Sequence, residues 1–293
     1  MVLLPQRLFD NPQVTTILRD GNVCVLAKEL TQPVLQREGY ISNHVISICL
    51  AGQQRIESYE GEIFTVNAGE VLFIPRGLYY VTDLLPKRGT FKSLLFYFDD
   101  QLIQEFLSTT RLTQIDRHEV PNHLKFGVAP TLELFAESLI HIYQNQQLGD
   151  KNFLNVKILE LLYLLNTLGE VQTFANFLFQ LTLPKKRNIK SFMETNFDKP
   201  LKIEDYAYLT GRSLSTFRRD FKSYYDTTPQ KWLKEQRLSK ALEILKQKEM
   251  SVTQLAYAVG YENISYFIKE FKQKVGQSPK QHILAQHRNN LSN

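Results

Sequence analysis

Four polar residues near the C-terminus have the types and the helical spacing of a surface that hydrogen-bonds to nucleic-acid bases. They are Ser215, Arg218, Arg219 and Lys222. Residues three or four positions apart lie on one face of an α-helix. Arginine can pair with guanine through two donors, a serine hydroxyl can bond to several bases, and a lysine near a helix end can contact a phosphate. The same face on an isolated helix could simply be solvated, so the prediction depends on its surroundings.

A related set of residues follows 50 positions later: Ile264, Ser265, Ile268, Lys269 and Lys272. This set keeps the hydroxyl and two cations, but Ile268 stands where the first set has an arginine. An exposed isoleucine can contact a thymine methyl group, and it can equally indicate weaker or less specific recognition. We therefore expect the first set to carry more of the specificity and the second to contribute more to anchoring.

Both sets belong to a duplicated unit of helix, glycine turn and helix. Matching residues recur 49 positions apart up to the glycine and 50 positions apart beyond it: Ala207 and Ala256, Gly211 and Gly260, Phe217 and Phe267, Phe221 and Phe271, Pro229 and Pro279. The extra residue therefore falls inside the turn, where glycine tolerates positive φ. Such a duplication favours DNA binding over a solvated basic face.

The helices that must position these residues can be predicted from periodicity and from capping residues. Ser213, Ser251 and Asn263 are suitable N-caps, and Ser251 forms a capping-box pattern with Gln254. The predicted helices are 188–196, 203–210, 213–225, a helix from 251 to the second glycine turn, and 264–275. A linking helix over 230–246 would be roughly 26 Å long. Successive major-groove faces are about 34 Å apart, so the DNA would bend or one helix would insert less fully.

The charge of the chain is divided unevenly. Residues 1–184 carry 14 Lys and Arg against 19 Asp and Glu, whereas residues 185–293 carry 21 against 11. The net charges are therefore −5 and +10, which suggests that only the C-terminal third faces a polyanion. A basic, helix-breaking run at Pro184–Asn188 predicts the boundary between domains 1–184 and 185–293.

The N-terminal half has the pattern of short strands separated by turns. Glycine, proline and asparagine turns separate runs of alternating or continuous apolar residues, which is typical of a small antiparallel barrel or jelly roll. The predicted strands are 23–27, 45–50, 53–59, 63–66, 71–74, 79–82 and 91–98. The interior either encloses one small ligand or is filled by Phe64, Leu72, Phe73, Ile74, Tyr79 and Tyr80.

After this half the pattern becomes helical. Asp99 and Asp100 can cap a helix that runs to Leu107. Further apolar helices are predicted over 129–146, 153–168 and 171–183. The 153–168 helix is apolar almost all round, which indicates burial on more than one side. Packing on the barrel explains this pattern, and we expect an added role in dimerisation.

Neither metal chemistry nor a membrane location is favoured. The six histidines are isolated in the sequence, and without a metal the barrel has no evident means of oxygenase or isomerase catalysis. The chain begins without a signal-peptide pattern, and its most apolar helical run is too short to span a bilayer. Cys24 and Cys49 are expected to be free thiols in a reducing cytosol. We therefore predict a cytoplasmic protein without cofactors.

The C-terminal motifs SLSTFRRDFK, RLSKALEIL and AYAVGYENISYFIKEFKQKVGQSP resemble the AraC/XylS-type DNA-binding domain, over about 188–284. This resemblance implies a sequence-specific bacterial transcription factor, usually an activator that contacts RNA polymerase and pairs through its N-terminal domain. AGQQRIESYEG and FTVNAGEVLFIPRG resemble the cupin-like barrel found in front of such domains. GEVLFIPRGLYYV, FKSLLFYF and KILELLYLL are similar to type III secretion activators, which tend to respond to a protein partner. Many cupins bind metal through an HxH pair, and this sequence has none.

The sequence thus predicts an α+β chain with a cupin-like barrel and dimerisation helices, followed by an all-α domain of two helix-turn-helix units. The expected partners are double-stranded DNA, RNA polymerase, a second copy of the chain, and a small-molecule or protein effector. One alternative is a cupin-type enzyme or ligand sensor whose basic tail is incidental. Another is a non-specific nucleoid-binding protein.

Overall fold

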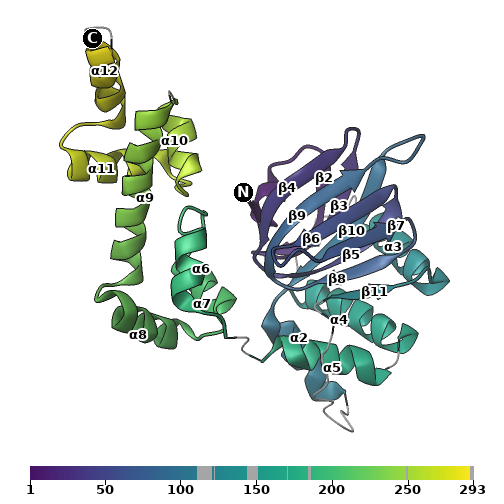
Figure 1. Cartoon of the computed structure of the whole chain (residues 1–293). Coiled ribbons are helices and arrows are strands. Elements are labelled where there is room, and N and C mark those ends of the chain that lie inside the picture. The colour runs from purple at the N-terminus through teal and green to yellow at the C-terminus, as the bar shows by residue number, and fades with distance from the viewer. Residues whose placement is uncertain are drawn as a thin grey trace. The chain divides into compact units, whose positions relative to one another are not determined.

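A computed structural model describes residues 1–110, 121, 123–143, 151–169, 171–183, 186–248 and 250–290. The chain divides into two compact units, Met1–Leu183 and Pro184–Asn293, called here the N-terminal unit and the C-terminal unit. Strands and helices build the first unit and helices build the second (Figure 1), so the predicted α+β class is confirmed. Within the described residues, no helix is both long enough and apolar enough to cross a membrane.

Two sheets form the N-terminal unit. One sheet has the strand order β1-β4-β9-β6-β7 and the other has the order β11-β8-β5-β10-β3-β2. The strands therefore form a cupin-like pair of sheets and not a single closed barrel. Their bounds are β1 Val2–Leu4, β2 Val14–Asp20, β3 Val23–Leu30, β4 Val34–Ile41, β5 His44–Ala51, β6 Gln53–Ser58, β7 Ile63–Asn67, β8 Val71–Ile74, β9 Gly77–Leu84, β10 Phe91–Phe98 and β11 Leu124–Phe126.

The central strands of the second sheet are buried on both faces, which explains their unbroken apolar sequences. In β10, Phe96 and Phe98 pack into the cluster on the helical side, whereas Leu95 and Tyr97 pack into the cluster between the sheets. Alternate side chains of a strand point to opposite faces. A single run of apolar residues therefore supplies two separate cores.

The same alternation decides which of the six residues considered as filling the barrel face the space between the sheets. Phe64, Leu72, Ile74 and Tyr79 belong to the cluster between the sheets. Phe73 points to the helical side instead, where its ring lies 5.0 Å from that of Phe177, centroid to centroid. Tyr80 is only partly buried. The interior is therefore less filled than this set of six residues suggested.

Helices cover the outer face of the second sheet (Figure 1). The helices of this unit are α1 Gln6–Phe9, α2 Asp100–Thr109, α3 Pro130–Tyr143, α4 Lys151–Leu168 and α5 Val171–Leu181. Asp99 caps α2 as predicted, because its carboxylate accepts hydrogen bonds from the N–H groups of Gln101 and Leu102. The helix predicted over 129–146 corresponds to α3, and its predicted end at Gln146 lies outside the described residues. Part of the Pro184–Asn188 junction lies outside them too.

Seven helices are described in the C-terminal unit: α6 Ile189–Asn196, α7 Ile203–Leu209, α8 Leu214–Tyr225, α9 Pro229–Gln247, α10 Val252–Ala258, α11 Ile264–Val275 and α12 Pro279–Asn290. The first six were predicted to within a few residues, and α12 was not predicted. The linking helix α9 extends from the first helix-turn-helix to the second (Figure 1). At about 1.5 Å per residue its 19 residues span roughly 28 Å.

Candidate nucleic-acid interface

The first helix-turn-helix, α7 and α8, exposes all four of its predicted residues. Gly211 in the turn has a φ of 66°. The Ser213 hydroxyl caps α8 by accepting a hydrogen bond from the N–H of Thr216 at 3.3 Å. Phe217 and Phe221 are fully buried, which turns the opposite face of the helix to solvent. That face carries Ser215, Arg218, Arg219 and Lys222, all of them exposed.

A turn residue fixes the first recognition helix, α8, to its surroundings. The Arg212 guanidinium donates from Nε to Asp220 Oδ2 of α8 at 3.0 Å, and from Nη1 to the carbonyl oxygens of Arg187 at 2.9 Å and Thr210 at 2.6 Å. A planar guanidinium with several satisfied donors holds one orientation. We therefore assign Arg212 to positioning α8 and not to binding DNA directly.

The second helix-turn-helix, α10 and α11, presents a matching face with one difference. Ser265, Lys269 and Lys272 are exposed, and Ile268 is 37% exposed. Ile264 is only partly buried at the start of α11, where it packs against the apolar cluster of this unit. Its position repeats that of Leu214, which is partly buried too, so the structure places Ile264 beside the outward face and not on it.

The second recognition helix, α11, is fixed by a different pair at the equivalent positions. The Tyr261 hydroxyl donates to Glu270 Oε2 at 2.8 Å, and the Tyr266 hydroxyl donates to Oε1 at 2.8 Å. Glu270 is 7% exposed and Tyr261 is 6% exposed. Burial and the hydrogen bond to the carboxylate raise the pKa of Tyr261, so its hydroxyl remains a donor at neutral pH.

The prediction from sequence did not include these positioning residues, although the repeat register contains them. Tyr261 follows Arg212 by 49 positions, and Glu270 follows Asp220 by 50, as the other repeated residues do. In both helix-turn-helix motifs, the residue after the turn glycine therefore contacts the same turn of the recognition helix. The chemistry of the contact has changed from an ion pair to a hydrogen bond with a carboxylate.

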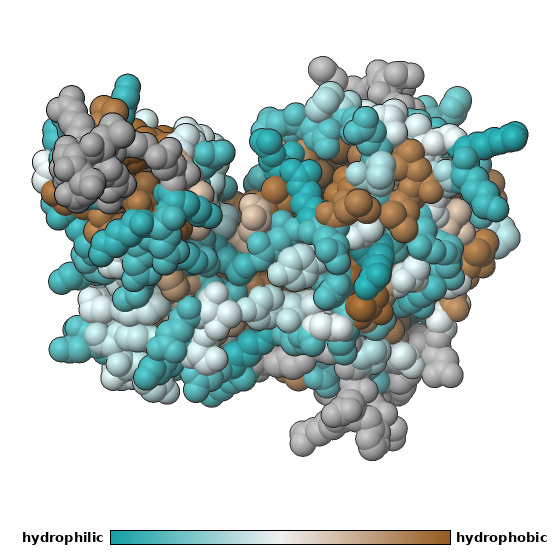
Figure 2. All heavy atoms as spheres, turned by 45° about the horizontal axis from the view of Figure 1, so that its top comes forward, coloured by the Kyte–Doolittle hydropathy of each residue, from teal (hydrophilic) through white to brown (hydrophobic). Residues whose placement is uncertain are grey.

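The basic side chains on the two outward faces are largely free of acidic partners. Among the residues that the structure describes, Arg218, Lys222, Lys269 and Lys272 form no ion pair. Arg219 is 77% exposed, and its Nη2 lies 3.5 Å from Asp220 Oδ1. The surface of the C-terminal unit in the view of Figure 2 is mostly hydrophilic. These charges are therefore available to a polyanion.

Two family models match the chain. The ExsA N-terminal regulatory domain matches residues 44–177, and a helix-turn-helix domain matches residues 206–283. The HTH-type transcriptional regulator ExsA of Pseudomonas aeruginosa is 24% identical over 238 residues, which cover 80% of this chain and 84% of that protein. The thermoregulatory protein LcrF of Yersinia pestis is 27% identical over 243 residues, covering 80% and 86%. Together these matches indicate an AraC/XylS-type transcription regulator.

This AraC/XylS-type regulator thus has a helix-turn-helix DNA-binding domain and an N-terminal regulatory domain, as predicted. Its chain is also similar to a crystal structure of a ToxT variant without ligand from Vibrio cholerae. That similarity has a TM-score of 0.45 with 11% sequence identity, and covers 91% of this chain and 98% of the other.

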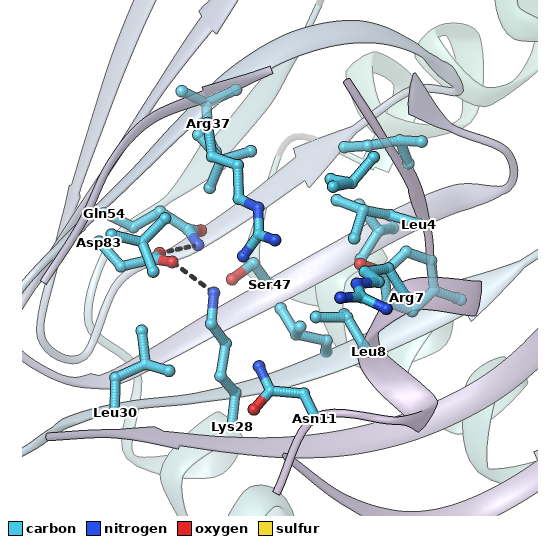
Figure 3. A pocket seen from close by; sticks show the side chains of 18 of the residues that line it. Leu4, Arg7, Leu8, Asn11, Lys28, Leu30, Arg37, Ser47, Gln54 and Asp83 are labelled. Atoms are coloured by element: carbon cyan, nitrogen blue, oxygen red, sulfur yellow. Dashed lines mark hydrogen bonds and ion pairs between the residues drawn. The ribbon is translucent and has the colours of Figure 1, made fainter. Parts of the chain in front are cut away.

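The N-terminal unit of the regulator contains a cavity of about 280 Å³ within its pair of sheets (Figure 3). Much of its lining is aliphatic, including Leu4, Leu8, Leu30, Ile56, Ile74 and Leu95. The N-terminal segment, through β1 and α1, supplies part of the wall. Of the two alternatives for the interior, a filled barrel and one that encloses a small ligand, the cavity favours the second because it leaves space for a small molecule.

Polar side chains from several strands meet in this cavity (Figure 3). Lys28 of β3 forms an ion pair with Asp83 of β9, and Gln54 Nε2 donates to Asp83 Oδ1 at 2.8 Å. Ser47 Oγ and Gln54 Oε1 are buried and have no hydrogen-bond partner among the described atoms. Arg37 points toward Ser47 from the cavity mouth (Figure 3). The cavity thus combines an apolar wall with unsatisfied polar atoms.

Metal-binding groups do not gather in the described part of the chain, where no three His, Cys, Asp or Glu side chains come together. His44, from the strand that lines the cavity, instead lies 2.8 Å from Asp100 at the start of α2. Cys24 and Cys49 are free and buried, and burial raises the pKa of Cys49 to about 11. These thiols are therefore protonated and unreactive at neutral pH.

Proposed function

We propose that this regulator reads two adjacent major-groove segments of double-stranded DNA, one with α8 and one with α11, and activates transcription from nearby promoters. The observation that carries the proposal is the pair of exposed donor-bearing faces on two equivalent, separately positioned helices. The domain boundaries at 1–184 and 185–293 form part of this proposal. α8 carries the greater specificity, because its arginines can pair with guanine through two donors.

The test compares variants of the intact protein on a DNA site selected by that protein from a random pool. Arg218→Ala should weaken cognate binding by about 1–3 kcal/mol and relax the preference at one base position. Lys222→Ala and Lys272→Ala should weaken binding to all sequences and each reduce the salt slope by about 1. The control is Lys246→Ala, at an exposed position of α9 outside both faces.

Two results would contradict this assignment. The first is an Arg218→Ala protein that binds cognate and scrambled DNA with unchanged affinities. The second is an intact protein that shows no preference over random competitor DNA, which would favour the non-specific nucleoid-binding alternative.

The N-terminal unit is proposed to receive the controlling signal, from a small molecule or a protein partner. The cavity supports the small-molecule form, because Ser47 and Gln54 offer polar atoms that a bound hydroxyl or amide group would satisfy. Ser47→Leu should remove any effector response of a reporter promoter while leaving DNA binding in the absence of effector unchanged. A normal response in this variant would instead favour a protein partner acting on the surface.

Dimerisation and contact with RNA polymerase in the cytoplasm complete the proposal. Exposed apolar side chains on the helical layer, Leu134 at 67% and Val156 at 56%, support pairing through α3 and α4. Sedimentation of the intact chain and of Leu134→Glu with Val156→Glu would test pairing, since the variant should be monomeric. Metal content and turnover assays test the cupin-enzyme alternative.

A further inference from the structure

A short loop after α6 contacts both helix-turn-helix units and the helix that links them. We call this segment, Phe197–Lys199, the interunit loop. Arg237 of α9 donates from Nε to the carbonyl oxygen of Phe197 at 2.7 Å and from Nη2 to that of Lys199 at 2.6 Å. Lys240, one helical turn further, pairs with the Asp198 carboxylate. Two basic residues of the linking helix are therefore engaged by three consecutive loop residues.

The second helix-turn-helix packs closely against this loop. Gly260 has a φ of 84°, and a Cβ atom at this position would lie 2.6 Å from the carbonyl oxygen of Asp198. Only glycine allows such an approach of backbone to backbone. The guanidinium of Arg237 also lies 5.7 Å from the ring centroid of Tyr261, whose hydroxyl holds Glu270 of α11. Contacts therefore continue from the interunit loop to the second recognition helix.

The first helix-turn-helix contacts the same segment from its other side. The buried Tyr206 hydroxyl of α7 donates to the carbonyl oxygen of Asn196, directly before the loop, at 2.8 Å. The ring of Phe197 meets Trp232 edge to face at 6.1 Å, and Trp232 meets Phe221 of α8 at 5.8 Å, centroid to centroid. Contacts therefore also continue from the loop to the first recognition helix.

From these contacts we propose that the interunit loop and Arg237 hold the two recognition helices at one fixed separation, so that the regulator selects DNA by the spacing of its two segments as well as by their sequence. This inference rests on the proposed reading of two segments. Arg237 is a positioning residue, because its guanidinium is engaged by the loop and lies on neither outward face. Without the loop contacts, α9 would still connect the two helix-turn-helix motifs but would no longer fix their relative orientation.

A fixed separation has a thermodynamic consequence. When one module is bound, the second binds as an intramolecular step whose effective concentration is high only for the matching geometry. Preorganisation raises affinity by removing the entropy cost of that step. An insertion of two base pairs rotates one segment by about 70° relative to the other, since about 10.5 base pairs make a turn. A rigid protein should tolerate that insertion poorly.

The experiment uses the full chain and the site selected for the proposed function, on three probes. The first is the complete site, the second has the α11 segment scrambled, and the third has two base pairs inserted between the segments. For the intact protein we expect the insertion to weaken binding about 100-fold. For Arg237→Gln we expect about 10-fold weaker binding to the complete site, unchanged binding to the second probe within about twofold, and an insertion penalty below about 10-fold.

Lys246→Gln is the matched control, since it removes a charge from the same helix without touching the interunit loop. It should leave the insertion penalty unchanged. If Arg237→Gln does not fold, Lys240→Gln replaces it, and the insertion penalty should again fall.

Equal weakening on all three probes would overturn the inference, because a general loss of stability has that effect. An unchanged insertion penalty in the folded variant would overturn it as well. If the intact protein selects no two-part site, the proposed function itself fails, and that result is distinct from both.

Discussion

The contact between Tyr261 and Glu270 gives a prediction whose size can be worked out from the structure. Tyr261→Phe removes only a hydroxyl that donates to a carboxylate at 2.8 Å, with both residues less than 10% exposed. Glu270 keeps the Tyr266 hydroxyl and Lys234 Nζ at 3.4 Å, but both of these contact its Oε1. Its Oε2 therefore loses the donor it has in the intact protein.

Hydrogen bonds to charged groups contribute about 1.5–3 kcal/mol. We therefore expect Tyr261→Phe to lower the free energy of unfolding of the C-terminal unit by about 2 kcal/mol. Urea unfolding followed by tryptophan fluorescence measures this quantity for the C-terminal unit alone, because Trp232 is the single tryptophan of the chain.

Tyr266→Phe is the matched control. It removes the same kind of bond to the other oxygen of Glu270, but its residue is 54% exposed, so water can replace the lost donor. We expect it to cost under about 1 kcal/mol. Equal losses for the two variants, or no loss for either, would refute the argument that burial makes the Tyr261 contact important.

Further predictions concern both units. Lys28→Met should destabilise the N-terminal unit by about 3–5 kcal/mol in calorimetry, because Asp83 is fully buried. Lys28→Met with Asp83→Leu should cost less, because no unpaired buried charge remains and only the Gln54 amide loses its partner; equal destabilisation of both would refute this. Gly260→Ala should lower the urea midpoint of the C-terminal unit, because its φ is positive and a backbone carbonyl lies in the way; an unchanged midpoint would show that the turn relaxes. The hydrogen bond from His44 lowers the pKa of the Asp100 carboxyl group. The stabilisation that this hydrogen bond gives is therefore present above the unfolded pKa of about 3.9 and is lost as the pH falls below that value. Asp100→Asn should therefore lose less stability than the intact protein between about pH 5 and pH 2, and a parallel decline would contradict the pairing.

Local signals made the C-terminal unit predictable. The N-caps Ser213 and Asn263 act within three residues of themselves, and the buried phenylalanines of α8 and α11 recur with helical spacing. Such features depend on neighbours in sequence, so they are visible without the structure. The exposed faces of both recognition helices follow from the same spacing.

Contacts between segments far apart in the sequence were harder to predict. The run Val71–Ile74 is buried on both sides, so nothing in its sequence tells which side chains face the cavity and which face the helices. Strand β4 contains charged residues and an irregularity where Gln36 has positive φ, which hides its alternation. Arg237 resembles any basic residue of an exposed helix until the interunit loop is seen beside it.

The two recognition helices are held by contacts that should respond differently to ionic strength. Arg212 and Asp220 form an ion pair whose carboxylate side chain is 29% exposed, so added salt screens it. Tyr261 holds Glu270 with an uncharged hydroxyl in a buried setting, which salt screens little. Raising the salt concentration should therefore loosen the orientation of α8 before that of α11, in addition to weakening phosphate contacts. The salt slope of DNA binding would then contain an intramolecular contribution from the first helix-turn-helix.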